Sequence, residues 1–147
     1  MPGHILWLDN DPAYLEPYVE TLREEKYEVK VVMTVSEAET ELQSQPFDLL
    51  ILDVMIPTKG AAEEARYGPK DTDKGAKTGL LFYLRNKDRL QEVATRVLVM
   101  TVRLDEDIVK QFVRSGLSRD CFVTKFEVRD DAVFLNRVEA LLGRAHD

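Results

Sequence analysis

The chain is 147 residues long, with 44% hydrophobic and 32% charged residues and a formal net charge of −7. That length fits one domain with a sizeable core, and the acidic balance argues against direct binding of nucleic acid. Cys121 is the single cysteine, which excludes an internal disulfide. No apolar run approaches the ~20 residues needed to cross a membrane, and no signal-peptide pattern is present. We therefore expect a cytoplasmic protein that does not interact with a membrane.

Apolar runs and helical patterns alternate along the chain. Short strands are predicted, in order, at 5–8, 29–33, 48–52, 97–100 and 122–124. Helices are predicted after them, beginning at Pro12, opened by a Ser36–Glu39 capping box, and then with apolar faces at 80–84, 108–113 and 135–142. Gly116 and Gly143 are expected to stop the last two helices. Five such units predict an α/β fold, in which a parallel sheet is covered by helices on both faces.

One segment interrupts this alternation. From Thr58 to Thr78 the chain is rich in Gly, Ala, Lys, Glu and Asp and lacks large aliphatic residues. Connections in α/β units usually run about 2–6 residues, so 58–78 is interpreted as an inserted loop between the third strand and the third helix. Residues 61–66 could form a helical turn or two, too short to be stable alone. We otherwise expect a single domain over 1–147, without a separate output domain.

Polar residues stand at the ends of four predicted strands. Asp9-Asn10-Asp11 follow the first strand, and Asp53, Thr101 and Lys125 follow or end the third, fourth and fifth. In a parallel sheet these ends share one edge, where α/β proteins bind ligands. Carboxylates from two strands suit Mg²⁺, a hard cation that prefers oxygen. A hydroxyl and an ammonium on neighbouring strands suit the oxygens of a phosphoryl group, so the set predicts a metal-dependent phosphoryl site.

At these residues the sequence resembles the receiver domain of two-component response regulators. The matching stretches are 5–12, 48–57, 97–101 and 122–125, in the same order and with similar spacing, so the resemblance covers the chain outside 58–78. The resemblance implies a flavodoxin-like (βα)₅ fold, with a doubly wound five-stranded sheet in three layers. It also implies a phosphorelay signalling domain rather than an enzyme.

The resemblance further implies a role for each strand-end residue. Asp53 would accept a phosphoryl group from a phosphohistidine on a histidine kinase or a phosphotransfer protein. Mg²⁺ would be held by Asp9, Asn10, Asp53 and the backbone carbonyl of Met55, with Asp11 as a further candidate. Thr101 would be the switch hydroxyl, Phe122 the aromatic switch residue, and Lys125 the partner of the phosphoryl oxygens. The surface of the fourth helix, fifth strand and fifth helix would then bind a downstream protein or a second copy of the chain.

Three departures from the family pattern qualify these expectations. The family usually has two adjacent acids where this chain has Asp9-Asn10, which predicts weaker Mg²⁺ binding. It usually has a cis Lys-Pro bond where this chain has Lys125-Phe126. Because a cis bond before a non-proline residue costs ~2.5–4 kcal/mol, we expect a trans bond here. The family glycine that follows the acceptor loop is reached only at Gly79, after the insertion.

Two other functions remain open from the sequence. Asn10 and Phe126 are compatible with a receiver-like interaction module that no longer depends on phosphorylation. Asp9-Asn10-Asp11 also resembles the Asp-x-Asp motif of haloacid dehalogenase-type phosphohydrolases, with Asp9 and Asp11 as the working acids. Against that third function, the family's later acidic pair lies at a strand end, whereas Asp130-Asp131 lie at a predicted helix start. The chain is also short and shows no cap domain.

Overall fold

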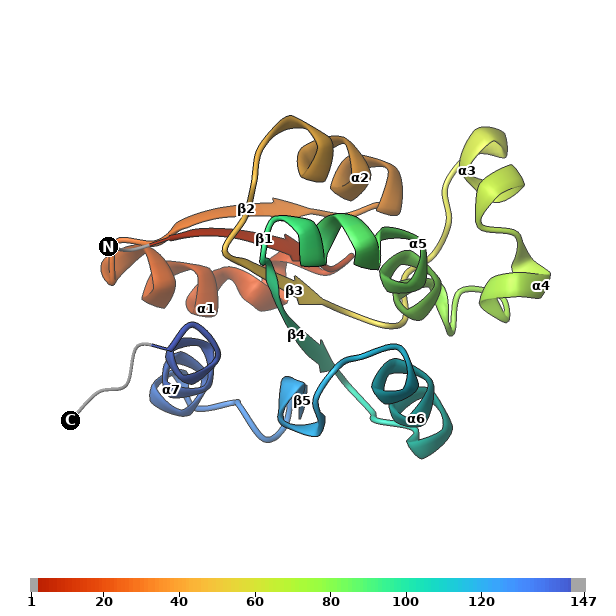
Figure 1. Ribbon diagram of the computed structural model, residues 1–147. Coiled ribbons are helices and arrows are strands. Elements are labelled where there is room, and N and C mark those ends of the chain that lie inside the picture. Colours follow the sequence, from red (N-terminus) through yellow and green to blue (C-terminus); the bar gives the residue numbers. More distant parts are fainter. Residues whose placement is uncertain (1–2, 144–147) are drawn as a thin grey trace.

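Five parallel strands form one sheet at the centre of the molecule (Figure 1). A computed structural model describes residues 3–143, so both ends of the domain predicted over 1–147 lie outside the described residues. The strands are β1 (His4–Leu8), β2 (Glu28–Val32), β3 (Leu49–Leu52), β4 (Arg96–Thr101) and β5 (Phe122–Thr124). Their order across the sheet is β2-β1-β3-β4-β5. This is the flavodoxin-like order, which confirms the predicted fold class.

Helices cover both faces of the sheet, as the alternating pattern predicted. They are α1 (Pro12–Glu24), α2 (Val35–Ser44), α5 (Thr78–Glu92), α6 (Glu106–Arg114) and α7 (Asp131–Leu141). Helices α1 and α7 pack on one face, and α2, α5 and α6 lie on the other (Figure 1). Gly116 and Gly143 follow α6 and α7 with positive φ, as expected of residues that stop a helix. A short 3₁₀ helix, η1 (Arg119–Cys121), precedes β5.

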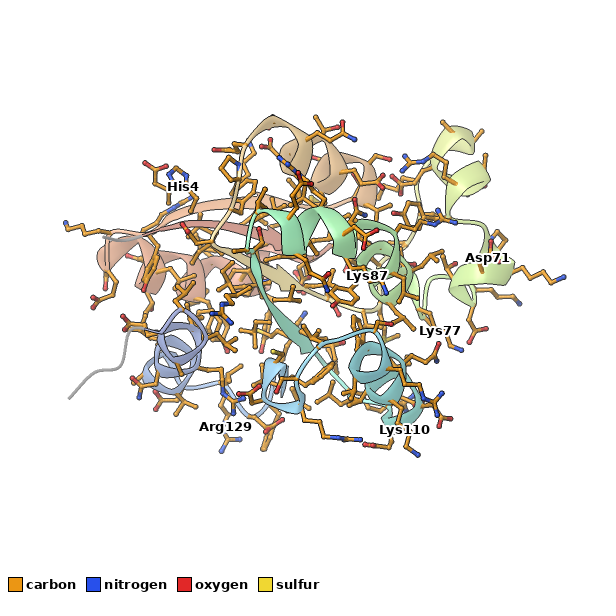
Figure 2. All side chains as sticks on the ribbon, viewed as in Figure 1. His4, Asp71, Lys77, Lys87, Lys110 and Arg129 are labelled. Atoms are coloured by element: carbon orange, nitrogen blue, oxygen red, sulfur yellow. The ribbon has the colours of Figure 1, made fainter. Side chains whose placement is uncertain are left out.

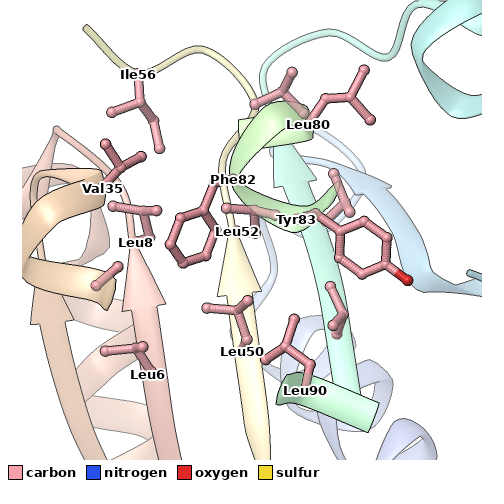
Figure 3. Close-up of a cluster of buried hydrophobic side chains, with 14 of the residues drawn as sticks. Leu6, Leu8, Val35, Leu50, Leu52, Ile56, Leu80, Phe82, Tyr83 and Leu90 are labelled. Carbon is pink, nitrogen blue, oxygen red and sulfur yellow. The ribbon is translucent and has the colours of Figure 1, made fainter. Parts of the chain in front are cut away.

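The two core clusters follow from the alternation of side chains along each strand. Leu6, Leu8, Leu50 and Leu52 point towards α2 and α5, where they pack with Phe82 (Figure 3). The intervening residues of the same strands belong to the opposite cluster, which contains Ile5, Trp7, Leu49, Ile51 and Phe134. Both faces of β1 and β3 are therefore apolar and buried, which explains why these strands read as continuous apolar runs.

The start of α2 differs from the prediction. The residue that caps the helix is Thr34, whose hydroxyl accepts a hydrogen bond from the backbone N–H of Glu37 and donates to the Glu37 carboxylate. The Ser36–Glu39 capping box is therefore wrong by two residues. Burial decides between the two candidates, because a helix that begins at Val35 places this fully buried residue in its first turn.

The segment between β3 and α5 contains the helical turns that the sequence allowed at 61–66, and a second short helix that it did not indicate. These two helices are α3 (Ala61–Arg66) and α4 (Pro69–Thr72). Both lie beyond the carboxyl ends of the strands, beside α5 (Figure 1). Tyr67, which follows α3, is fully buried and belongs to the core cluster that includes Leu50 and Phe82. Packing against the domain thus supplies the stability that helices this short lack alone. Within residues 3–143, no helix is long and apolar enough to cross a membrane.

Candidate functional site

Two buried carboxylates lie side by side at the carboxyl edge of the sheet. Asp9 directly follows β1 and Asp53 directly follows β3, and these two strands are neighbours. The strand ladder continues into both acids, because Asp9 N–H donates to the Val32 carbonyl and Asp53 N–H to the Leu8 carbonyl, each at 3.0 Å. From β1 the chain adds β2 on one side of the sheet and then β3 on the other. The strand order therefore switches between β1 and β3, which is where α/β proteins bind ligands. The structure thus places the two predicted acids together.

Lys125 joins the two carboxylates. Its Nζ lies 2.8 Å from Asp9 Oδ2 and 3.4 Å from Asp53 Oδ2. The lysine directly follows β5, and its backbone N–H donates to the Thr101 carbonyl at 2.7 Å. Most charged side chains of the protein, such as Asp71 and Lys110, project from the surface (Figure 2), whereas Lys125 is only 8% exposed. The structure contains no cis peptide bond within residues 3–143, so the Lys125-Phe126 bond is trans, as expected.

Burial and neighbouring charges shift the pKa values of Asp9 and Lys125. Burial raises the pKa of the Asp9 carboxyl above its ordinary value, while the close contact with the Lys125 ammonium opposes this and the nearby charge of Asp53 adds to it. Burial alone would lower the pKa of the Lys125 ammonium, but its interactions with Asp9 and Asp53 outweigh burial and raise that pKa. Lys125 is therefore a permanently charged group at neutral pH, placed between two carboxylates.

Thr101 ends β4, between the strands that deliver Asp53 and Lys125. Its side chain is 1% exposed, and its hydroxyl has no hydrogen-bond partner among the residues that the structure describes. Buried hydroxyls without a partner are uncommon because each costs free energy. The predicted switch hydroxyl is thus available for an incoming polar group at this edge of the sheet.

The donor set fits a hard divalent cation. Asp9 Oδ2 is buried and, although ion-paired with Lys125, accepts no hydrogen bond of regular geometry within residues 3–143. Two carboxylates with neutral oxygens and water are a usual set for Mg²⁺. No group of three or more His, Cys, Asp or Glu in the described part of the chain could hold a metal. Any cation here would therefore depend on Asp9 and Asp53 together with uncharged donors.

The other predicted metal ligands lie around this pair. Asn10 and Asp11 are exposed in the loop after β1, and Met55 is exposed in the loop after β3. Asp11 caps α1, since its Oδ1 accepts from Tyr14 N–H at 3.3 Å. Met55 N–H points back to Asp53 Oδ1 at 3.3 Å. Asp11 is thus engaged at the helix start, and it does not form a three-acid group with Asp9 and Asp53.

Gly79 is a closely packed position beside the site that the sequence only hinted at. A Cβ atom on Gly79 would lie 2.1 Å from the Asp53 carbonyl oxygen and 2.8 Å from Val54 Cα. Gly79 N–H donates to the Val54 carbonyl at 2.9 Å, and Ile56 N–H donates to the Gly75 carbonyl at 3.2 Å. The end of the insertion therefore packs directly on the backbone of the loop that follows Asp53. The signal in the sequence was the late position of Gly79, which follows the acceptor loop only after the insertion.

Phe122, the predicted aromatic switch, lies on the α5–α6 side of the sheet. It is 8% exposed, and its ring contacts Phe112 of α6 edge-to-face, with centroids 5.5 Å apart. Phe112 in turn contacts Tyr83 of α5 at 5.4 Å. The ring is thus part of the packing between β5 and α6.

The acidic pair Asp130-Asp131 does not belong to this site. Asp130 caps α7, accepting from Ala132 N–H at 2.8 Å. Asp131 accepts a hydrogen bond from the Thr21 hydroxyl at 3.3 Å. This acidic pair therefore serves the start of a helix, as the sequence indicated.

Solved structures of response regulators share this architecture. A receiver domain protein described as CheY-like, from Methanospirillum hungatei, matches with a TM-score of 0.73 and 17% identity, over 97% of this chain and 95% of that one. The chemotaxis response regulator CheY4 of Vibrio cholerae matches with a TM-score of 0.70 and 18% identity, over 96% and 99%. The receiver domain of DrrB, in a BeF3-activated form, matches with a TM-score of 0.69 and 23% identity, over 98% and 100%.

The chain has the receiver fold. At these identities the match establishes the fold and leaves the chemistry to the residues of the site. No protein-family model matches the sequence, and the search of curated proteins found no match. The receiver fold nevertheless spans nearly all of the chain, so the insertion at 58–78 is accommodated without disturbing the order of the strands.

Proposed function

We propose that the chain is a single receiver domain, with an insertion at 58–78, that accepts a phosphoryl group on Asp53 from a phosphohistidine. The donor would be a histidine kinase or a phosphotransfer protein. The observation that carries this proposal is the buried cluster of Asp9, Asp53 and Lys125, beside a buried Thr101 hydroxyl without a partner in the described residues. Burying these charges carries a desolvation penalty, so stability gives no reason to keep the cluster. With a divalent cation bound beside Lys125, the cluster could receive a phosphoryl group.

The proposed transfer is an in-line displacement at phosphorus. A carboxylate oxygen of Asp53 attacks phosphorus in line with the phosphohistidine bond. A P–O bond forms, the P–N bond breaks, and its electron pair stays on the imidazole. Lys125 offsets charge on the equatorial oxygens and is held ready by the two carboxylates. Mg²⁺ held by Asp9, Asn10, Asp53 and the Met55 carbonyl would neutralise further charge on those oxygens.

Phosphorylation would then change a surface for partner binding. In this proposal Thr101 moves towards the phosphoryl group, where its hydroxyl gains the partner that it otherwise lacks. Phe122 repacks against α6 in response, and the surface of α6, β5 and α7 shifts between two populations. A downstream protein, or a second copy of the chain, would bind one of the two forms.

Incubation with a small phosphodonor and Mg²⁺ tests the proposal directly. We expect a mass increase of one phosphoryl group that is absent in Asp53→Ala. Metal binding is measured separately by titration, so that a missing mass increase is not caused by missing Mg²⁺. An unmodified wild-type protein with bound Mg²⁺ would contradict the assignment.

A second function is favoured by one feature of the site. Lys125 already pairs with both carboxylates, and Asn10 supplies no charge to a metal. A receiver-like interaction module that works without phosphorylation would keep this closed arrangement. It predicts that partner binding is unchanged in Asp53→Asn, whereas the phosphoacceptor proposal predicts that phosphodonor no longer alters binding in this variant.

The insertion would control access to Asp53. Near its C-terminal end, the Gly75 carbonyl accepts a hydrogen bond from Ile56 N–H of the acceptor loop. Its helices lie at the same edge of the sheet as the site (Figure 1). Replacing 60–74 with a short Gly/Ser linker keeps the Gly75 contact and removes the helices. We expect this deletion to change the lifetime of phospho-Asp53. An unchanged lifetime would indicate that the insertion is a spacer or a partner contact.

A further inference from the structure

Tyr14 places an aromatic ring over the lysine of the site. The centroid of this ring lies 5.1 Å from Lys125 Nζ, within the range of a cation–π contact. Tyr14 is 39% exposed, whereas Lys125 is 8% exposed. The ammonium is thus surrounded by the Asp9 and Asp53 carboxylates and by the face of this ring.

Asp11 links the position of Tyr14 to Asp9 of the site. Asp9 Oδ1 accepts from Asp11 N–H at 2.9 Å, and Asp11 Oδ1 accepts from Tyr14 N–H at 3.3 Å. These two bonds connect the first turn of α1 to the carboxylate that pairs with Lys125. The start of the helix and the site therefore share one hydrogen-bonded turn.

The ring itself is supported from the core. Its centroid lies 5.9 Å from that of the Tyr18 ring, one helical turn further along α1. Tyr18 is buried and contacts Phe134 of α7 edge-to-face at 5.0 Å. The backbone of Tyr14 is thus held by Asp11, and its ring by an aromatic stack between α1 and α7.

We propose that Tyr14 is a positioning residue that holds the Lys125 ammonium between Asp9 and Asp53 and so prepares it to meet the phosphoryl group. A lysine side chain has many rotamers, and restricting them in advance removes an ordering cost from the reaction. The negative face of the ring attracts the ammonium without competing for its hydrogen-bond donors. The effect on phosphorylation rests on the proposed function, while the hold on Lys125 does not.

Two substitutions separate the ring from the rest of the side chain. Tyr14→Leu removes the aromatic face, and Tyr14→Phe keeps it without the hydroxyl. Val133→Ala on α7 is the control, because Val133 is also a large hydrophobic residue that is partly exposed. Circular dichroism and thermal unfolding verify that all three variants fold.

The first measurement does not depend on phosphorylation. In NMR spectra of the wild type, the ring current of Tyr14 should shift the Lys125 ε-methylene protons upfield, and the Lys125 ammonium should show restricted motion. We expect both signals in Tyr14→Phe and Val133→Ala and neither in Tyr14→Leu. A wild-type Lys125 without these signals overturns the proposal, whatever the phosphorylation assay gives.

The second measurement is the rate of phosphorylation by a small phosphodonor at saturating Mg²⁺. We expect Tyr14→Leu to be slower by about two- to fivefold, the factor that corresponds to a cation–π contact at an exposed site, and Tyr14→Phe to keep the wild-type rate. If the wild type is phosphorylated and Tyr14→Leu reacts at the same rate, the effect of Tyr14 on phosphorylation is overturned, but its hold on Lys125 is not. A wild type that is not phosphorylated overturns the proposed function, and the NMR signals then decide the hold on Lys125.

Discussion

The backbone of Asp53 leaves no space for a side chain at residue 79. The Cβ of Gly79→Ala would meet the Asp53 carbonyl oxygen at 2.1 Å and Val54 Cα at 2.8 Å. Both are backbone atoms, so the acceptor loop itself would have to shift. We expect a loss of about 1–3 kcal/mol in the free energy of unfolding, as for other overpacked sites, together with slower phosphorylation. Chemical denaturation and the phosphodonor assay measure the two effects.

Gly68→Ala is the matched control for this substitution. Gly68 lies in the insertion directly before α4, and the atom nearest to a Cβ there would be the Glu64 carbonyl oxygen at 3.4 Å, which is ordinary van der Waals contact. This variant should be as stable and as reactive as the wild type. A Gly79→Ala protein that matched it in both assays would show that the close approach at Asp53 is easily relieved.

Asp9 gives the stability of the metal-free protein a characteristic pH dependence. Burial and the charge of Asp53 raise the pKa of the Asp9 carboxyl in the folded state. The folded protein therefore binds a proton here that the unfolded chain has released, and stability falls as pH rises from the unfolded pKa, about 4, to the folded pKa. Denaturation across this window should show the decline in the wild type and a flatter profile in Asp9→Asn.

Mg²⁺ should oppose that decline, because the cation needs the deprotonated carboxylate. At low pH added Mg²⁺ should hardly change the free energy of unfolding, and above the folded pKa of Asp9 it should raise it. Asp9→Asn should lose most of this gain. A Mg²⁺ effect that did not depend on pH, or that survived in Asp9→Asn, would place the cation elsewhere.

At the scale of elements, the sequence predicted the five strands and their helices but not the start of α2. Two overlapping Ser/Thr-x-x-Glu patterns, Thr34–Glu37 and Ser36–Glu39, satisfy the capping rule equally well. Thr34–Glu37 caps the helix, while Ser36 and Glu39 bind the insertion. Local pattern could not separate them, because the partners of Ser36 and Glu39 lie 27 and 28 residues away in the chain.

Glu63 anchors the insertion to the start of α2. Its Oε2 accepts from the Ser36 hydroxyl at 2.5 Å and from Ser36 N–H at 3.3 Å, and its Oε1 accepts from Lys59 N–H at 2.9 Å. The side chain is only 4% exposed. The carboxylate thus meets a backbone donor at the N-terminus of α2, where a negative charge is favoured. The hydrogen bond from Tyr67 to Glu39, at 3.0 Å, makes a second anchor.

Glu63→Gln should loosen the insertion without unfolding the domain. Both carboxylate oxygens accept hydrogen bonds, and an amide can replace only one of them as an acceptor. We expect the free energy of local opening of 59–77 to fall by about 1–3 kcal/mol, which is typical of a buried donor left unpaired. Hydrogen exchange should accelerate there and stay unchanged in β1 and β3. Glu64→Gln, next to it and exposed, is the control, and equal exchange in the two variants would remove Glu63 as the anchor.

At the scale of the whole molecule, what the sequence predicted of the site depended on the parallel sheet. Once five βα units were recognised, Asp9, Asp53, Thr101 and Lys125 had to share one edge, and the structure places them there. The Lys125 contacts with both carboxylates and with the Tyr14 ring could not be predicted. These contacts join β5, β1, β3 and α1. The local pattern does not predict them, because tertiary packing sets the strand order and the direction of each side chain.

The two core clusters lead to a prediction about how a signal would cross the molecule. Phe122 and Phe112 belong to the cluster that includes Leu50 and Phe82, whereas Trp7 and Phe134 belong to the cluster on the other side of the sheet. A phosphoryl group on Asp53 that attracts the Thr101 hydroxyl would change the packing of Phe122 on α6. Phosphorylation should therefore alter hydrogen exchange in 104–124 more strongly than in α1.

Thr101→Ala tests this coupling, because the variant keeps Asp53 and Lys125 but lacks the hydroxyl. It should be phosphorylated, as shown by mass, without the change in exchange at 104–124. Thr124→Ala is the control, since Thr124 ends the neighbouring strand and its hydroxyl accepts from Glu127 N–H at 3.1 Å, away from the acids. A response of 104–124 that persists in Thr101→Ala would mean that another contact carries the change, and the Lys125 link from Asp53 to β5 would be the first to examine.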